Sequence, residues 1–335
     1  MRKVTLFFLL ISLMTIQQLN AQRLTDSIAE HMLVYQRSIG GWPKAINNVV
    51  VKYDRHLSPS EKAAVKADSL KDDATIDNRA TTREINYLIK SYQQTQNLRY
   101  LKAAEKGLNY LFKAQYANGG WPQYYPQHNI YRGQITYNDN AMMNVMNILQ
   151  DIIEGKNGFN VLDQKFKAQA QLAVSKGIQC ILKTQITVNG KLTAWCAQYD
   201  ERTLQPAKAR SFELISTSGM ESVAIVEFLM RIQKPSSAVK EAVQSAMLWF
   251  ESSKIIGYDF VNKALVKSPN STIWARFYEI GTNEPFFTGR DGIKKKNITE
   301  IEEERRVGYA WYGKWPARLI VKKYPEWLQR NLNYR

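Results

Sequence analysis

A short sequence motif that recurs along the chain limits the folds that this protein can adopt. Gln36 is followed after three residues by Gly-Gly-Trp-Pro, Gln115 is followed by the same residue types at the same spacing, and a weaker copy covers 183–195. A glycine in such a place can end a helix in a left-handed conformation, and the proline keeps the helix from resuming. Internal repeats indicate an architecture built from one recurring unit. We therefore expect each copy to mark the end of a helical unit.

Apolar residues between these copies recur at intervals of three and four, which is the period of an amphipathic helix, and strand-like alternation is scarce. The helices that this period predicts follow one another in pairs: 81–94 with 98–115, about 140–153 with about 164–184, and about 220–232 with about 237–252. Three consecutive helix pairs predict a mainly all-α fold, an (α/α)3 barrel or toroid of helix hairpins with long loops and minor β-structure. The 335 residues are ample for a buried core.

The starts of the first two helix pairs also resemble each other. Residues 75–78 (Thr-Ile-Asp-Asn) precede the first pair, and residues 136–140 (Thr-Tyr-Asn-Asp-Asn) precede the second. In up-and-down hairpins the start of the first helix and the end of the second lie on one rim, so we expect Asp77, Asp139 and the Gly-Trp loops on one face. Each aspartate alone would be an ordinary helix N-cap, worth about 1 kcal/mol. Together with neighbouring amide oxygens, they suit a hard cation such as calcium.

Aromatic residues also fall on the predicted rim, where each ring either stacks on a sugar or belongs to the core: Trp42, Trp121, Tyr124, Tyr125, Tyr137 and Trp195. The chain has only three histidines and two cysteines, which leaves little material for an imidazole metal site or a Ser-His-Asp triad. The chemistry must come from carboxylates and cations. Cys180 and Cys196 are either bridged or separately buried.

The N-terminus has the layout of a secretory signal peptide, with Arg2 and Lys3 before an apolar run at 4–16 and a polar stretch that closes near Ala21. A membrane anchor is the alternative, but the run is shorter than the ~20 apolar residues that a span needs. We expect residues 1–21 to be removed and residues 22–335 to form a single catalytic domain. That mature protein would be secreted or periplasmic, monomeric and free of the membrane.

The formal net charge of +16 predicts that the protein attracts polyanions. Nucleic acid is excluded because an exported protein rarely meets it and the chain has no zinc-finger spacing or RNA-binding signature. An acidic glycan fits better, although excess Lys and Arg also simply improve solubility. In the polar loop 195–213, Lys208 and Arg210 alternate, so both would point the same way in an extended segment. They form either a structural ion-pair network or a site for an anionic substrate.

Arginine and aromatic residues are interleaved at 274–279 and 304–313. These segments are either a β-ribbon packed on the barrel or a surface that grips carboxylates, since a guanidinium can fork a carboxylate with two hydrogen bonds.

In order along nearly the whole mature chain, the sequence resembles polysaccharide lyase family 10, the pectate lyases, at these segments: 40–44, 75–78, 119–123, 135–141, 195–198, 206–210, 274–278 and 306–313. The resemblance implies an α/α toroid with a cleft on one rim. It also implies that polygalacturonate is cleaved by β-elimination, with Ca²⁺ between protein carboxylates and the substrate uronate, which acidifies the hydrogen at C5. Neutralising the uronate stabilises the enolate-like charge that develops.

The site residues that the resemblance implies fall into three groups. Asp77 and Asp139 would hold calcium with help from Asn78 or Asn138; Arg210 would be the base, with Asp77 in the catalytic set; Lys208, Arg276, Arg306, Tyr309, Trp121 and Tyr312 would bind substrate. The sequence departs from the family's commonest pattern at Arg79 and at Gly133-Gln134, and these departures affect the preference of the substrate subsites. An arginine base conflicts with a guanidinium pKa above about 12. Lys208, whose pKa shifts more readily, is therefore the second candidate.

Other functions compete with this interpretation. The Gln-x-x-x-Gly-Gly-Trp repeat is also similar to that of terpene cyclases, but the signal peptide, the basic charge and the cationic loop argue against an apolar cyclase cavity. A glycoside hydrolase on the same toroid would need two carboxylates that flank the scissile bond. A non-catalytic module that binds acidic glycans is the third alternative.

Overall fold

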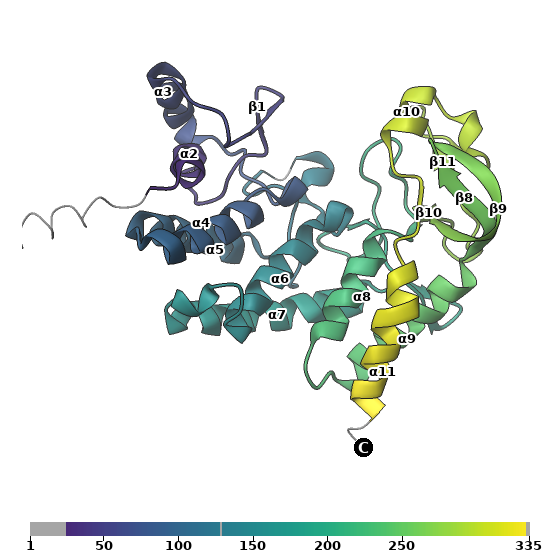
Figure 1. The fold of residues 1–335 in the computed structure, drawn as a ribbon. Helices are drawn as coiled ribbons and strands as arrows, with labels where there is room; N and C mark the ends of the chain where they lie inside the picture. The colour runs from purple at the N-terminus through teal and green to yellow at the C-terminus, as the bar shows by residue number, and fades with distance from the viewer. Residues whose placement is uncertain (1–24, 128, 333–335) are drawn as a thin grey trace, which may run out of the picture.

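Three consecutive helix pairs dominate the structure, a computed structural model that describes residues 25–127 and 129–332 (Figure 1). The pairs are α4 (Thr82–Thr95) with α5 (Leu98–Ala114), α6 (Ala141–Glu154) with α7 (Gln164–Thr184), and α8 (Glu221–Arg231) with α9 (Ser237–Ser252). Each predicted helix is present with its bounds within one residue. The mainly α-helical toroid is thus confirmed, and the chain crosses it pair by pair from α4 to α9. The predicted signal peptide lies outside the described residues.

Smaller elements surround these pairs. The other helices are α2 (Ser27–Tyr35), α3 (Pro59–Ala67), α10 (Glu303–Gly308) and α11 (Tyr324–Leu332), the last entered from a π-helical turn at Leu319–Lys323. The strands are β1 (Ala45–Ile46), β2 (Val49–Val50), β3 (Ile135–Thr136), β4 (Thr187–Val188), β5 (Lys191–Leu192), β6 (Gln198–Tyr199), β7 (Thr217–Ser218), β8 (Ile255–Val261), β9 (Ala264–Ala275), β10 (Phe277–Tyr278), β11 (Phe287–Thr288), β12 (Lys294–Lys295) and β13 (Tyr312–Gly313). No helix among the described residues is long and apolar enough to cross a bilayer.

The β8–β9 hairpin is the largest element that the sequence did not predict. Its turn is formed by Asn262 and Lys263, both with positive φ, and a bulge interrupts the pairing beyond Ile256. β9 also pairs with β13, which joins Ala275 to Tyr312. This pairing confirms the β-ribbon alternative for the Trp-Ala segment at 274–275, whereas the Glu-Arg-Arg segment at 304–306 lies in helix α10.

Each repeat copy ties one outer helix to the next. Gln115 directly follows α5, and its Nε2 donates to the carbonyl oxygens of Gly119 at 3.0 Å and of Ala173 in α7 at 2.9 Å. The equivalent bonds of Gln36 reach Ala103 in α5, and those of Gln185 reach Ala242 in α9. Because a buried amide must be hydrogen-bonded, this residue type fixes both the turn and the spacing of neighbouring helices.

The glycines of these copies do not end helices, contrary to the prediction. α5 has already ended at Ala114, and Gly119 lies in the turn beyond it with a φ of +97°. A Cβ at Gly119 would lie 2.0 Å from the carbonyl oxygen of Lys176 in α7. Glycine is therefore required because the turn packs directly against the backbone of the next outer helix.

The tryptophan of each copy belongs to the core. Trp42, Trp121 and Trp195 are all 0% exposed. Each indole Nε1 donates to a carbonyl of the preceding helix, as Trp121 does to Leu111 at 2.8 Å. The core extends from α2 to α11 and includes Cys180 and Cys196, which are free thiols rather than a disulfide.

Candidate active site

The rim is built from equivalent segments that precede α4, α6 and α8. The backbone N–H groups of Thr75, Thr136 and Ser218 donate to the carbonyls of the three core tryptophans at 3.1, 3.1 and 2.7 Å. Two residues beyond each threonine begins a short 3-10 turn, Asp77–Arg79 before α4 and Asn138–Asn140 before α6. The repeated architecture thus places two polar turns at corresponding points of one rim, as the sequence predicted.

Aspartate and asparagine occur in opposite order in the two turns, as Asp77-Asn78 in the first and Asn138-Asp139 in the second. The middle residue of each turn, Asn78 at a φ of 49° and Asp139 at 50°, is left-handed, a conformation that Asn and Asp tolerate better than most side chains. The last residue of each turn also has a positive φ. Neither aspartate caps the helix that follows, because the N-cap positions are Thr81 and Asn140 and neither makes a side-chain capping bond. The ordinary N-cap interpretation of Asp77 and Asp139 is therefore wrong.

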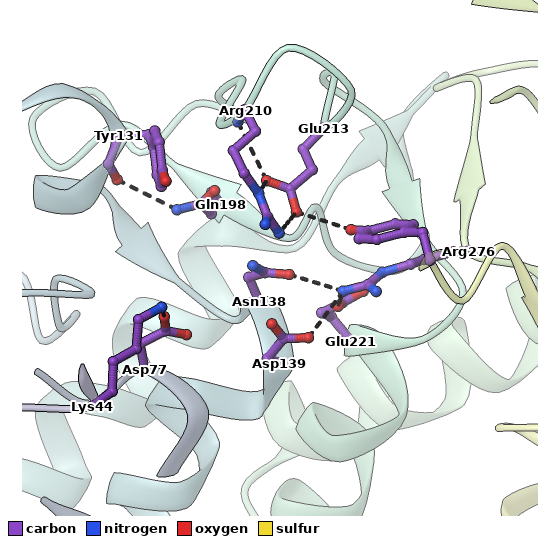
Figure 2. Close-up of polar contacts among 11 residues, drawn as sticks. Lys44, Asp77, Tyr131, Asn138, Asp139, Gln198, Arg210, Glu213, Glu221 and Arg276 are labelled. Carbon is purple, nitrogen blue, oxygen red and sulfur yellow. Dashed lines mark hydrogen bonds and ion pairs between the residues drawn. The ribbon is translucent and has the colours of Figure 1, made fainter. Parts of the chain in front are cut away.

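These turns open onto a cavity of about 490 Å³ (Figure 2). The charged and amide side chains on its wall include Lys44, Asp77, Asn78, Asn138, Asp139 and Arg210. Arg210 descends from the loop opposite, and its guanidinium points toward Asn138 and Asp139. Two helix starts and one distant loop therefore bring carboxylates, amides and a guanidinium together on one cavity wall.

Lys44 neutralises Asp77. It follows the first Gly-Gly-Trp-Pro copy, and its Nζ forms an ion pair with Asp77 Oδ2. Burial lowers the pKa of Lys44, but the charge and hydrogen bond of Asp77, together with Tyr124, outweigh burial, so the net direction is upward. Lys44 was not among the site residues predicted from the sequence. Its position directly after a motif on the predicted rim was the available signal.

Arg276 is hydrogen-bonded to both the amide and the acid of the second turn, Asn138 and Asp139. Its Nη2 donates to Asn138 Oδ1 at 2.9 Å and to Asp139 Oδ1 at 3.3 Å, and it forms a buried ion pair with Glu221. Burial lowers the pKa of Arg276, but the charges of Glu221, Tyr309 and Asp139 together outweigh burial, so the net direction is upward. The side chain is only 3% exposed. Arg276 thus orients protein oxygens in this structure, whereas the sequence predicted that it grips a substrate carboxylate.

Arg210 is held by Glu213, three residues further along the loop. Its Nε donates to Glu213 Oε2 at 2.7 Å, its Nη2 contacts Oε1, and Tyr309 donates to the same Oε1 at 2.9 Å. The hydrogen bonds to Glu213 raise the pKa of Arg210 above its ordinary value. The guanidinium is therefore a firmly protonated cation in this state.

Several predicted substrate-binding residues lie elsewhere. Lys208 does not line this cavity, because residues 207–213 turn instead of running extended: Ala209 N–H donates to the Glu213 carbonyl at 3.0 Å. Arg306 lies in α10 and does not line the cavity either. Tyr309 holds Glu213, and its ring lies 4.4 Å from the Arg276 guanidinium carbon. Tyr312 is half-buried against Phe260 and Phe287, Trp121 is fully buried, and neither lines this cavity.

The oxygen donors on the cavity wall suit calcium but do not complete its coordination. Asp77 and Asp139 supply carboxylates, and Asn78 and Asn138 supply amide oxygens. A third carboxylate on the wall, Asp73, is forked by Arg37 at 2.6 and 2.7 Å. Within residues 25–127 and 129–332 no three Asp, Glu, His or Cys side chains gather closely enough to hold a metal. Since Ca²⁺ takes about 6–8 oxygens, water or ligand oxygens must complete the shell.

Comparison with known families identifies what this arrangement belongs to. Residues 36–320 match the family model described as pectic acid lyase. The chain belongs to the pectic acid lyases of polysaccharide lyase family 10. No curated protein matches it. Among solved structures, the family 10 polysaccharide lyase from Cellvibrio cellulosa is 33% identical, with a TM-score of 0.80 over 92% of this chain and 94% of that one.

A mutant of the same Cellvibrio lyase in complex with trigalacturonic acid is 34% identical, with a TM-score of 0.81 over 92% of this chain and 93% of the other. The lyase assignment excludes the terpene cyclase, hydrolase and non-catalytic alternatives as descriptions of the family.

Replacing Trp121 with alanine is expected to destabilise the lyase without a specific effect on sugar binding. The indole is fully buried and hydrogen-bonded to Leu111, so its removal leaves a cavity and an unpaired carbonyl that cost about 3–5 kcal/mol of unfolding free energy. Denaturant unfolding would measure this cost. The affinity for trigalacturonate, measured on the folded variant at low temperature, should stay within about 3-fold of wild type. A large loss of affinity in a stable variant would restore Trp121 to the substrate site.

Proposed function

We propose that this family 10 lyase cleaves α-1,4-linked polygalacturonate by calcium-assisted β-elimination, with Arg210 as the base. The observation that carries the proposal is that Asp77, Asp139 and Arg210 lie on the wall of one cavity although they are far apart in the chain. A proton abstraction at C5 needs a base beside the C–H bond and a positive charge beside the carboxylate that C5 carries, and this wall offers both kinds of group.

Asp77, Asp139, Asn78 and Asn138 would hold the calcium ion. When bound, calcium neutralises the substrate carboxylate and stabilises the negative charge that develops after proton loss. In this structure Lys44 forms an ion pair with Asp77, and Arg276 forms one with Asp139. To bind calcium, Asp77 must therefore share its carboxylate between Lys44 and the ion or lose the contact with Lys44. Arg276 can remain on Glu221 while Asp139 turns toward the ion, because Glu221 is its closer partner.

Arg210 would remove the proton from C5. In its neutral form the guanidine takes this proton, the C–H electron pair forms the C4–C5 double bond, and the C4–O bond breaks; the leaving oxygen takes a proton from water. The contact with Glu213 opposes the neutral form. Calcium and the cations Lys44 and Arg132 on the same wall act in the other direction, because like charge favours the neutral guanidine. Lys208 is less suited, since it does not line this cavity.

The basic charge of the protein suits a polyuronate, and the related Cellvibrio lyase is complexed with trigalacturonic acid. We infer that residues 1–21 direct export and that residues 22–335 act as one secreted or periplasmic, monomeric catalytic domain.

The deciding experiment follows the ultraviolet absorbance of the C4–C5 unsaturated uronate during incubation with polygalacturonate and calcium. We expect absorbance to rise with calcium and to stop when a chelator is added. New reducing ends without absorbance would indicate hydrolysis instead. Retention of the polymer with neither signal would indicate a binding protein.

A further inference from the structure

Glu213 is a buried carboxylate whose oxygens are committed to Arg210 and Tyr309. The residue is 5% exposed, and it takes two side-chain hydrogen bonds from Arg210 and one from Tyr309. A buried charge is tolerated only when it is paired and hydrogen-bonded. Glu213 therefore cannot move away from Arg210 without a large cost, and Arg210 is anchored to the same degree.

The backbone of this loop makes the anchor rigid. Glu213 N–H donates to the Arg210 carbonyl at 2.9 Å, and Ala209 N–H donates to the Glu213 carbonyl at 3.0 Å. The side chains of Arg210 and Glu213 therefore project side by side from one hydrogen-bonded turn. Figure 2 shows the result: the guanidinium of Arg210 lies against the Glu213 carboxylate and is aimed at Asn138 and Asp139. A long, flexible side chain that is 40% exposed is in this way given one direction.

Other charged and titratable groups face this pair from several elements. They are Tyr309 beside Glu213, Arg276 against the Tyr309 ring, Tyr131 and Arg290 within electrostatic reach of Arg210, and Arg305, which lies over the Phe212 ring that Arg210 also covers. Three of these are arginines, whose charge does not change below about pH 12. Glu213 is the carboxylate that is bonded directly to Arg210, so it controls the local balance of charge.

We propose that Glu213 is a positioning residue that fixes both the aim and the protonation of Arg210, and that it thereby sets the alkaline range in which the lyase turns over. This inference rests on the proposed role of Arg210 as base. A bound carboxylate stabilises the guanidinium form, so fewer molecules carry a neutral Arg210 at a given pH. The same bond keeps the nitrogen on target and makes it a stronger base once it is neutral.

The test is the pH dependence of kcat for polygalacturonate with saturating calcium in wild type and Glu213→Gln. Glutamine keeps the shape and one acceptor oxygen but removes the charge. If neutral Arg210 is the base, kcat rises with pH as Arg210 loses its proton. We expect this alkaline rise to move to lower pH by about 1–3 units in the variant, the shift that one adjacent opposite charge produces. The highest kcat should fall, because the base is weaker and less well aimed, whereas KM should change by less than about 3-fold.

The chain offers a matched control. Glu84 is also a buried carboxylate bound to an arginine and a tyrosine, Arg83 and Tyr53, but none of the three lines this cavity. Glu84→Gln should therefore lower stability and leave the pH profile in place. If Glu213→Gln does not fold, Glu213→Asp retains the charge at a greater distance, and its alkaline rise should move in the same direction by less.

A folded Glu213→Gln or Glu213→Asp enzyme whose kcat falls at every pH while the alkaline rise stays in the wild-type position would overturn the inference, because Glu213 would then only support the loop. Failure of the proposed function looks different. In that case Arg210→Ala would remain active, whatever the profile of the Glu213 variants.

Discussion

The Arg210→Ala variant is expected to lose turnover of polygalacturonate while it still binds the polymer. General-base catalysis contributes about 10²–10⁴-fold, so kcat should fall by at least that factor. Binding should survive because Lys44, Arg132 and the two acid–amide turns remain on the cavity wall. Unsaturated-product absorbance would give kcat, and calorimetric titration with trigalacturonate would give the affinity.

Two further variants sharpen this result. Arg132 lines the same cavity but stacks on Tyr124, with its guanidinium carbon 4.8 Å from the ring. Arg132→Ala should therefore raise KM more than it lowers kcat. Lys208→Ala should retain most of the turnover, because Lys208 does not line the cavity. Substantial activity in Arg210→Ala together with its loss in Lys208→Ala would transfer the role of base to Lys208.

Much of the fold could be predicted because helix period and chain topology are local or nearly local signals. The apolar spacing located all six paired helices, and up-and-down connection alone put Asp77 and Asp139 on one rim. Hydrogen bonds between segments, such as that from Thr136 N–H to the Trp121 carbonyl, hold this rim. They recur with the repeat, so the position of the rim could be predicted without them.

The orientation of individual side chains could not be predicted in the same way. Trp121 follows a glycine turn, and the sequence does not say that this turn packs onto α7 and buries the ring. Lys208 and Arg210 alternate, but the hydrogen bond from Ala209 to Glu213 bends the segment and separates them. Arg276, between strands β9 and β10, is buried because Glu221 at the start of α8 faces it. Such pairings depend on tertiary contacts between distant segments.

The β8–β9 hairpin shows the opposite limit. Its turn at Asn262-Lys263 is a local signal of positive φ, but the strands carry lysine, serine and proline and are broken by Gly257. Their pairing relies on backbone bonds and on the contact of β9 with β13, which lies about forty residues away. Regular alternation of apolar residues was therefore absent from the sequence.

Asp77→Asn and Asp139→Asn are each expected to lower kcat/KM at fixed calcium by at least about 100-fold, comparable to the loss of one charge-stabilising donor from an active site. If both acids hold one ion, the double variant should cost hardly more than the worse single variant, because the second substitution removes a ligand of a site that is already lost. Rates measured over a calcium titration would give the four corners of this cycle. Additive losses would mean that the two acids act separately.

The third carboxylate of the cavity, Asp73, provides the matched control for this cycle. Arg37 is 0% exposed and forks Asp73 with two hydrogen bonds, so this acid is already occupied by a cation that has no other side-chain partner among the described residues. Asp73→Asn should therefore lower the free energy of unfolding by about 1–3 kcal/mol, because the buried Arg37 loses a charged partner that is itself 32% exposed. Below its melting temperature it should keep the wild-type dependence on calcium. The contrast works because all three acids share one wall and differ in what holds them: Asp73 is fixed by a buried arginine, whereas Asp77 and Asp139 face cations that calcium can replace.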